Sequence, residues 1–254
     1  SNGIRGNRFI RKMNLKTSSG FGLSGKKKKH LDEHVAEDGY LTYTLQPELQ
    51  AELMTMESTL SAGQRIYPIA TTSCKDEPTK FGKAKVRIFM VLPFLFNLLG
   101  RMLILPIIAT LQSIPLVSEM AVGMRVDTEE WAELYAYLTT IGEEGVAHQI
   151  LEGDYSGYDQ RQTSQMIGVA GYIILTIARH IGFDEKTLVK MNAWFNDLAN
   201  PLISYAGVLL TFFGFNLSGH LATVVVNSLV NSMLFRMAYF DYYIKAGYHP
   251  SRRP

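Results

Sequence analysis

The chain has 254 residues, 47% of them hydrophobic, so it can bury the core of one large or two small domains. Its single cysteine, Cys74, excludes an internal disulfide framework and fits a reducing compartment. The net charge of +2 hides an asymmetry, because residues 1–30 carry many Lys and Arg side chains and no acid. This polar, basic start does not resemble a signal peptide.

A basic, glycine-rich segment opens the chain. Small polar residues at 17–20 precede a run of four lysines at 26–29. Backbone N–H groups and hydroxyls in such a loop can line a phosphate track, and the lysines add the charge that attracts a polyanion. The alternative is a solvated or disordered basic tail, which is the commoner explanation of a lone lysine run.

The next elements are a helix and a cationic strand. Pro47 and Gly63 predict a helix over 47–62. Lys83, Lys85 and Arg87 alternate with apolar residues, so they would project from one face of a strand. An exposed face of an ordinary sheet is the alternative, although three like charges repel unless an anion such as a triphosphate is present.

Residues 88–111 are the most apolar part of the chain and raise the question of a membrane span. Arg101, Asn97 and two prolines interrupt the run, which favours a buried helix behind the cationic strand. Beyond it, Asp127 and Glu130 have the spacing of a capping box and predict a helix over 127–139.

The most informative stretch is Gly153-Asp154-Tyr155-Ser156-Gly157-Tyr158-Asp159. Residues 146–151 before it predict a short apolar strand, and the apolar periodicity after it predicts a helix to about Gly182. Asp154 at the end of a strand would suit a hard cation, and Asp159 would lie near a helix N-terminus. The alternative is that Asp159 is only an N-cap and Asp154 only a solvated loop acid.

Two further elements follow the central motif. Asp184 predicts the cap of a helix that runs to about residue 200. The β-rich residues 201–215, with Ala206-Gly207 at their centre, predict a hairpin.

A turn and a helix form the last informative stretch. Ser218-Gly219 predicts a flexible turn ahead of the helix. Thr223, Asn227 and Asn231 recur every four residues and form a polar stripe on it. A solvated face is the alternative, but lysine and glutamate usually fill such faces, so we expect the stripe to bind hydrogen-bonding partners.

Four of these stretches, in this order, resemble the RNA-dependent RNA polymerases of picorna-like positive-strand RNA viruses. Residues 154–159 are similar to the family's motif A, and Ser218-Gly219, Thr223 and Asn227-Ser228 are similar to its motif B. Lys75-Asp76-Glu77 with the cations at 83, 85 and 87 resembles the basic motif F, and residues 17–20 with the lysine run resemble motif G. Four motifs in the right order are far more specific than any one of them.

The resemblance implies an α+β fold with right-hand polymerase architecture. It comprises fingers and a partial palm of ferredoxin-like or RRM-like type, and the thumb is absent. The expected parts are fingers with the template-entry and NTP-entry motifs at 1–111, a first part of the palm with motif A at 112–198, a fingers insertion at 199–215, and the palm's motif B loop and helix at 216–254.

The resemblance also implies nucleotidyl transfer from an NTP to the 3′-hydroxyl of an RNA primer, directed by an RNA template. Two Mg²⁺ ions, with Mn²⁺ as a substitute, would be held by Asp154 and the main-chain carbonyl of Tyr155. The implied catalytic residues, of which all but Asp154 and Gly219 would sense the ribose 2′-hydroxyl, are Asp154, Asp159, Ser218, Gly219, Thr223 and Asn227. The implied NTP-binding residues are Lys75, Lys83, Lys85 and Arg87. The implied RNA-binding residues are Thr17, Ser18, Ser19, Gly20, Lys26, Lys27, Lys28 and Lys29.

The implied setting is the host cytoplasm, at viral replication complexes, with other viral replication proteins as partners and no transmembrane segment. The family's Gly-Asp-Asp motif, which carries the second metal-binding acid, does not occur before Pro254, so we expect the chain alone to be inactive. That lack favours one rival function, a non-catalytic RNA-binding module. Other rivals are a membrane-associated protein using residues 88–111 and a reverse transcriptase, which the pair Asp159 and Asn227 disfavours.

Overall fold

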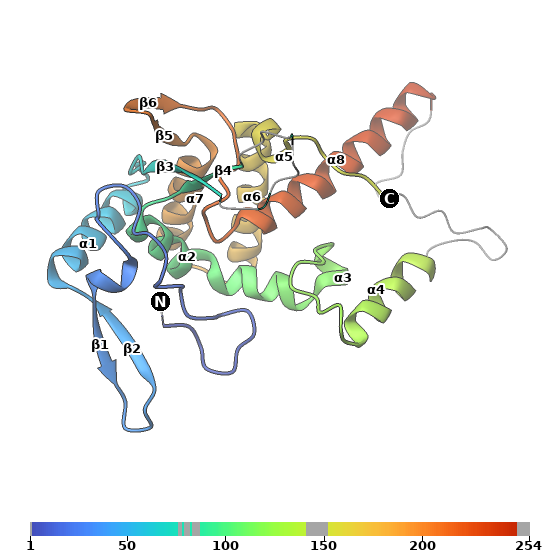
Figure 1. Ribbon diagram of the computed structural model, residues 1–254. Coiled ribbons are helices and arrows are strands. Elements are labelled where there is room, and N and C mark those ends of the chain that lie inside the picture. Colours follow the sequence, from blue (N-terminus) through green and yellow to red (C-terminus); the bar gives the residue numbers. More distant parts are fainter. Residues whose placement is uncertain (1, 76–77, 79–81, 83–86, 141–151, 248–254) are drawn as a thin grey trace.

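The computed structural model describes residues 2–75, 78, 82, 87–140 and 152–247 (Figure 1). Most of its core is helical, with a mixed sheet on one side and a β-hairpin projecting from the body. This is the α+β class expected from the sequence. In chain order the elements are η1 (Lys27–His30), β1 (Leu31–Val35), β2 (Leu41–Leu45), α1 (Pro47–Ser61), β3 (Ile69–Cys74), β4 (Ile88–Val91), α2 (Phe94–Ser113), α3 (Pro115–Ser118), α4 (Glu129–Thr140), α5 (Tyr158–Arg161), α6 (Ser164–His180), α7 (Glu185–Ala199), β5 (Leu202–Tyr205), β6 (Val208–Thr211) and α8 (Thr223–Lys245).

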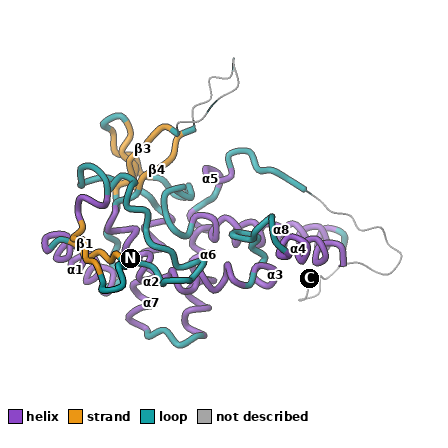
Figure 2. Tube along the Cα trace, turned by 60° about the horizontal axis from the view of Figure 1, so that its bottom comes forward, coloured by secondary structure: helices purple, strands orange, loops and turns teal. Residues whose placement is uncertain are grey.

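The main core lies where α2, α6, α7 and α8 meet (Figure 2). Trp194 of α7 is fully buried, stacks on Phe96 of α2 and donates its indole N–H to the Phe96 carbonyl over 3.2 Å. Gly100 lets α2 approach this ring, because a Cβ there would overlap the indole. The side chain of Asp184 caps α7 by accepting from the Thr187 N–H at 2.9 Å, as the sequence predicts.

Two glycine substitutions test this packing. Gly100→Ala should lower the free energy of unfolding by about 1–3 kcal/mol, because the added methyl overpacks the α2–α7 contact. Gly168→Ala should raise it by about 0.5–1 kcal/mol, because Gly168 lies within α6 with no atom within 4 Å of the added Cβ. Urea denaturation of both variants measures the difference, and equal effects would contradict the tight contact at Gly100.

The four-stranded sheet has the order β4-β3-β5-β6, in which β3 and β5 are parallel and the other pairs are antiparallel. Residues 202–211 therefore join a sheet begun by strands more than a hundred residues earlier in the chain. Ala206 (φ 49°) and Gly207 (φ 81°) are the two turn residues between Tyr205 and Val208. Two positive φ values in a two-residue loop are typical of a hairpin turn, which confirms the predicted hairpin.

Helix α2 is long and apolar enough to cross a membrane by length and composition, and 67% of its most apolar window is buried inside the fold. It contacts α1, α6 and α7. This confirms the predicted buried helix, which begins at Phe94 after the short strand β4. The strands expected over 83–86 and 146–151 lie outside the described residues.

One predicted helix is divided and one predicted cap is absent. The helix expected after the central motif, ending near Gly182, is divided into α5 and α6 at Gln162 and Thr163, because the Gln162 carbonyl accepts from the Phe215 N–H at 2.7 Å and Thr163 caps α6. Helix α4 begins at Glu129 without the predicted capping box. The Glu130 carboxylate instead binds the guanidinium of Arg8 and the backbone N–H of Arg125.

Candidate active site

Residues 154–159, which we call the motif A segment, contact the start of α8 through side chains. Asn227 of α8 donates its amide N–H to Asp159 Oδ1 over 3.3 Å. Tyr155 donates its hydroxyl to Asn231 Oδ1 over 2.9 Å, one helical turn further along α8. The structure therefore brings together a carboxylate, Asp159, and an amide, Asn227, that lie 68 residues apart in sequence.

Two tyrosines of motif A support this contact. The rings of Tyr155 and Tyr158 stack with their centroids 4.5 Å apart. Burial, with Tyr155 and Asp159 nearby, raises the pKa of Tyr158 to about 12, so its hydroxyl keeps its proton and donates to the Asn227 carbonyl over 2.9 Å. Asp159 lies in the single turn of α5 behind Gly157, which has φ 62° and occupies the N-cap position, so the alternative of Asp159 as a mere N-cap was wrong.

Gln162, Asn216 and His220 form a buried set of hydrogen-bonded side chains behind Asn227, which we call the polar relay. The Oδ1 of Asn227 accepts from Gln162 Nε2 at 2.6 Å and from Asn216 Nδ2 at 2.7 Å. Asn216 Oδ1 in turn contacts His220 Nε2 at 2.8 Å. Gln162, Asn216 and His220 are all buried, so these bonds are shielded from water.

The turn at Ser218-Gly219 packs on strand β4. Ser218 is exposed, and its Oγ accepts from the Met90 N–H at 3.5 Å, at the limit of a hydrogen bond. A Cβ at Gly219 would overlap the Met90 carbonyl oxygen, so only glycine allows this approach. The Thr223 hydroxyl contacts the carbonyls of Leu217 and His220, each at 2.9 Å, and thereby closes the turn.

Two of the four cations predicted to bind the NTP, Lys75 and Arg87, lie side by side at the end of the β3–β4 pair. The Lys75 N–H donates to the Arg87 carbonyl over 2.8 Å, directly beyond the paired residues Cys74 and Ile88. Lys75 and Arg87 are both exposed. Lys83 and Lys85 lie outside the described residues.

The basic loop is held to the rest of the fold by hydrogen bonds and is not a free tail. Ser19 is buried; its N–H donates to the Gly25 carbonyl at 3.0 Å, and its carbonyl accepts from the Phe94 N–H at 2.8 Å. Gly20 has φ 80°, and a Cβ there would lie 2.7 Å from the Leu92 carbonyl oxygen. The loop is thus fixed to the start of α2.

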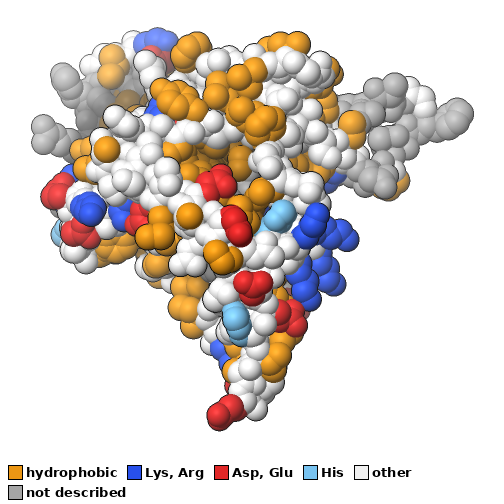
Figure 3. All heavy atoms as spheres, turned by 90° about the vertical axis from the view of Figure 1, so that its left-hand side faces the viewer, with side chains coloured by type: hydrophobic (Ala, Val, Ile, Leu, Met, Phe, Trp, Pro, Cys, Tyr) orange, Lys and Arg blue, Asp and Glu red, His pale blue; other side chains and the backbone are white. Residues whose placement is uncertain are grey.

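The four lysines of the loop are not equivalent. Lys27 donates its ammonium to Thr17 Oγ1 at 2.6 Å, and burial together with Arg101 nearby lowers its pKa. Lys28 forms an ion pair with Glu33 at 2.9 Å. Lys26 and Lys29 are exposed. Figure 3 shows the largest cluster of Lys and Arg side chains at the right edge of the face that it draws, with others at the left and top.

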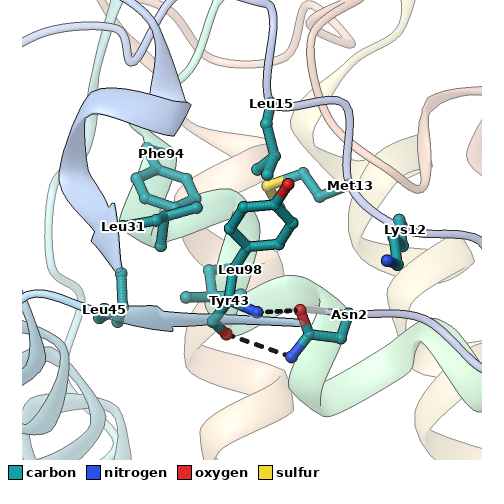
Figure 4. A pocket seen from close by; sticks show the side chains of 9 residues that line it. All are labelled: Asn2, Lys12, Met13, Leu15, Leu31, Tyr43, Leu45, Phe94 and Leu98. Carbon is teal, nitrogen blue, oxygen red and sulfur yellow. Dashed lines mark hydrogen bonds between the residues drawn. The ribbon is translucent and has the colours of Figure 1, made fainter. Parts of the chain in front are cut away.

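A cavity of about 100 Å³ lies beneath this loop, away from the motif A segment (Figure 4). Met13, Leu15 and Leu31 line it together with Tyr43. The Asn2 side chain forms hydrogen bonds with both the N–H and the carbonyl of Tyr43, at 2.8 and 3.1 Å. Most of the residues that line it are apolar.

Sequence and fold comparisons agree with this arrangement. Residues 1–249 match the protein family described as "Viral RNA-dependent RNA polymerase". The chain belongs to this family. It is 26% identical over 238 residues to the genome polyprotein of Deformed wing virus and 28% identical over 210 residues to the RNA1 polyprotein of Satsuma dwarf virus.

A solved structure shows the same fold. The Sicinivirus 3Dpol RNA-dependent RNA polymerase superposes with a TM-score of 0.71 at 23% identity, over 91% of this chain and 46% of that chain. The match to the two polyproteins covers 88% and 80% of this chain but only 8% and 10% of their own length. The chain thus spans just under half of the solved relative and about a tenth of the curated ones.

The donor chemistry of this polymerase chain fits Mg²⁺ in part. Asp154 is exposed and lies one residue before the Tyr155 carbonyl, and both offer the oxygen atoms that Mg²⁺ prefers. Within the described ranges no group of three His, Cys, Asp or Glu side chains converges as a metal site. The chain supplies one carboxylate and one carbonyl, so further ligands are needed to complete the site.

Three residues that hydrogen-bond to Asn227 or to one another were missed from the sequence, namely Gln162, Asn216 and His220. One signal was available, because residues 198–235 contain no Asp, Glu, Lys or Arg. In such a run the few strongly polar side chains must be satisfied locally, and Asn216 and His220 are two of them.

His220 makes the chain sensitive to acid. Burial lowers its pKa from 6.5 to about 3, so at pH 5 the unfolded chain binds a proton that the folded chain does not. The free energy of unfolding should therefore be about 2 kcal/mol lower at pH 5 than at pH 7 because of this residue alone. Urea denaturation of wild type and His220→Gln at both pH values measures how much of the pH dependence of the free energy of unfolding is due to His220. An equal pH dependence in the two proteins would contradict the buried neutral imidazole.

Proposed function

We propose that the chain forms the fingers and part of the palm of an RNA-dependent RNA polymerase, and that the segment around Asp154 is its catalytic centre. The observation that carries this proposal is the docking of motif A on motif B through Tyr155–Asn231, Tyr158–Asn227 and Asn227–Asp159. These contacts hold the Asp154 segment against the start of α8, in which Asn227 is half-buried, and Ser218 in the turn before α8 is exposed.

The reaction proposed is attack of a primer 3′-oxygen on the α-phosphate of an NTP, with pyrophosphate as the leaving group. Two Mg²⁺ ions, when bound, supply the activation of the attacking oxygen and the stabilisation of the leaving charge. Asp154 and the Tyr155 carbonyl would hold them, with Mn²⁺ as a substitute. Further acidic ligands would come from the part of the polymerase that this chain does not span.

The other predicted residues take roles in binding. Lys75, Lys83, Lys85 and Arg87 would bind the triphosphate, which is supported by the meeting of Lys75 and Arg87 at the end of β3 and β4. Asp159, Ser218, Thr223 and Asn227 would sense the ribose 2′-hydroxyl, which distinguishes RNA from DNA. Residues 17–20 and 26–29 would guide the template, because their exposed lysines can pair with phosphates.

The proposed division of the chain follows the sheet. Strand β5 pairs with β3, and β6 pairs with β5, so residues 202–211 return to the proposed fingers unit of residues 1–111. Residues 112–198 and 216–254 would belong to the palm. The polymerase would act in the host cytoplasm at viral replication complexes, with an RNA template, a primer and other viral replication proteins.

Primer extension tests the proposal. We define the parent polymerase as the longer protein to which we assign this chain. It should extend an RNA primer on an RNA template only with Mg²⁺ or Mn²⁺, and the 254-residue chain alone should not. RNA binding by the parent polymerase without any templated incorporation would instead support the non-catalytic RNA-binding module.

A further inference from the structure

The side-chain amide of Asn227 has two ends of similar shape and opposite hydrogen-bonding character. Its nitrogen donates and its oxygen accepts, and a rotation of 180° exchanges them. Only the nitrogen can bind the Asp159 carboxylate, which lies 3.3 Å away. Something in the fold must therefore fix the direction of this amide.

The direction is set by backbone groups, which cannot be reversed. The Ala222 N–H lies 3.2 Å from His220 Nδ1, so this ring nitrogen must be the acceptor. In a neutral imidazole the other nitrogen, Nε2, then carries the hydrogen and donates to Asn216 Oδ1 at 2.8 Å. A second backbone group agrees, because the Thr223 carbonyl accepts from Asn216 Nδ2 at 3.2 Å.

The orientation of the Asn216 amide in turn fixes the orientation of the Asn227 amide. With its oxygen on His220, its nitrogen faces Asn227 Oδ1 at 2.7 Å. Gln162 Nε2 donates to the same oxygen at 2.6 Å. A flipped Asn227 would place its own N–H groups against these two donors, so the relay leaves only one orientation, with the nitrogen toward Asp159.

Gln162 shows that the relay has an energetic cost. Its Nε2 reaches Asn227, but its Oε1 is buried and has no hydrogen-bond partner among the described residues. A buried, unsatisfied acceptor is unfavourable and persists only where the opposite end of the group is needed. The need here is a second donor on Asn227 Oδ1.

We propose that His220, Asn216 and Gln162 are positioning residues for sugar selection. They hold the Asn227 amide nitrogen toward Asp159, so that the pair presents one fixed donor and acceptor pattern to the ribose 2′-hydroxyl of an incoming NTP. The inference rests on the proposed function. A site built to bind a hydroxyl discriminates strongly against the analogue that lacks it, provided that its polar groups keep their positions.

The test uses isosteric variants of the parent polymerase. Asn216→Asp and Gln162→Glu each remove the N–H donors to Asn227 with almost no change in shape. The readout is the ratio of kcat/KM for an NTP to kcat/KM for the matching 2′-dNTP, taken in one preparation so that any unfolded fraction cancels. We expect each variant to lower this ratio by roughly tenfold or more, mainly through poorer discrimination rather than lower kcat for the NTP.

Two further variants examine the source of the polarity. His220→Leu removes the donor to Asn216 and should lower the ratio, whereas His220→Gln keeps an N–H at a similar reach and should recover part of it. Asn192→Asp, on the exposed side of α7, is the matched control and should leave the ratio unchanged.

Two outcomes would overturn the inference. If Asn227→Ala lowers the ratio but Asn216→Asp and Gln162→Glu do not, the relay does not position Asn227, although the proposed ribose-sensing role stands. If the wild-type parent polymerase incorporates no nucleotide, or if Asn227→Ala also leaves the ratio unchanged, the proposed function of the site fails and the inference fails with it.

Discussion

Asp154→Asn should abolish nucleotide incorporation by the parent polymerase, with kcat at least roughly 10³-fold lower. Asp154 is exposed and makes no ion pair or hydrogen bond with any residue in the described ranges, so no contact among these residues depends on its charge. The amide has the same shape but lacks the negative charge needed to bind Mg²⁺. The melting temperature should therefore stay unchanged while activity is lost.

Glu152→Gln is the matched control for this variant. Glu152 is an exposed acid of the same loop, two residues earlier, and the substitution makes the same change of charge. Its activity should stay close to that of the wild type. RNA binding by Asp154→Asn should be equal to or tighter than that of the wild type, because an acid near the phosphates has been removed. Equal activity of the two variants would show that Asp154 has no special role.

Asp197→Ala should lower the free energy of unfolding by about 3–5 kcal/mol. The Asp197 side chain is fully buried at the end of α7. It accepts from Arg65 Nε at 2.9 Å and from the backbone N–H groups of Ile66 and Tyr67 at 2.9 and 3.2 Å. Its loss would leave one cation and two backbone donors without their acceptor.

The same contacts stabilise an unusual backbone conformation. Tyr67 has φ 52°, which is uncommon for a bulky residue, and its N–H is one of the donors to Asp197. The bond fixes the chain just before β3, so the variant should also loosen the sheet that holds Lys75 and Arg87. Asp184→Ala is the matched control, because it removes only an exposed N-cap of the same helix and should cost about 1 kcal/mol. Urea denaturation compares the two, and equal losses would contradict the account.

Much of the fold could be predicted because its signals are local. Pro47 at the first turn of α1, the Asp184 cap of α7 and the turn at Ala206-Gly207 each act within a few residues of the element that they define. The family resemblance added the order of the motifs. It also paired Asp159 with Asn227, a contact that no local rule could supply.

The predictions that failed concern positions where contacts with residues distant in sequence outweigh the local pattern. The break between α5 and α6 depends on the pairing of Gln162 with Phe215, more than fifty residues away. Glu130 has the spacing of a capping box but is drawn to Arg8, 122 residues earlier. The relay of His220, Asn216 and Gln162 depends on the same kind of long-range packing, so the sequence pattern alone did not show it.

Localised cleavage by bound iron would reveal where the catalytic metals bind. Fe²⁺ replaces Mg²⁺ in the parent polymerase with RNA and NTP, and ascorbate with peroxide then generates hydroxyl radicals that cut the backbone beside the metal. We predict cuts within a few residues of Asp154, competed away by excess Mg²⁺ and lost in Asp154→Asn. Cuts that avoid this segment, or that persist in Asp154→Asn, would contradict the placement of the catalytic metals.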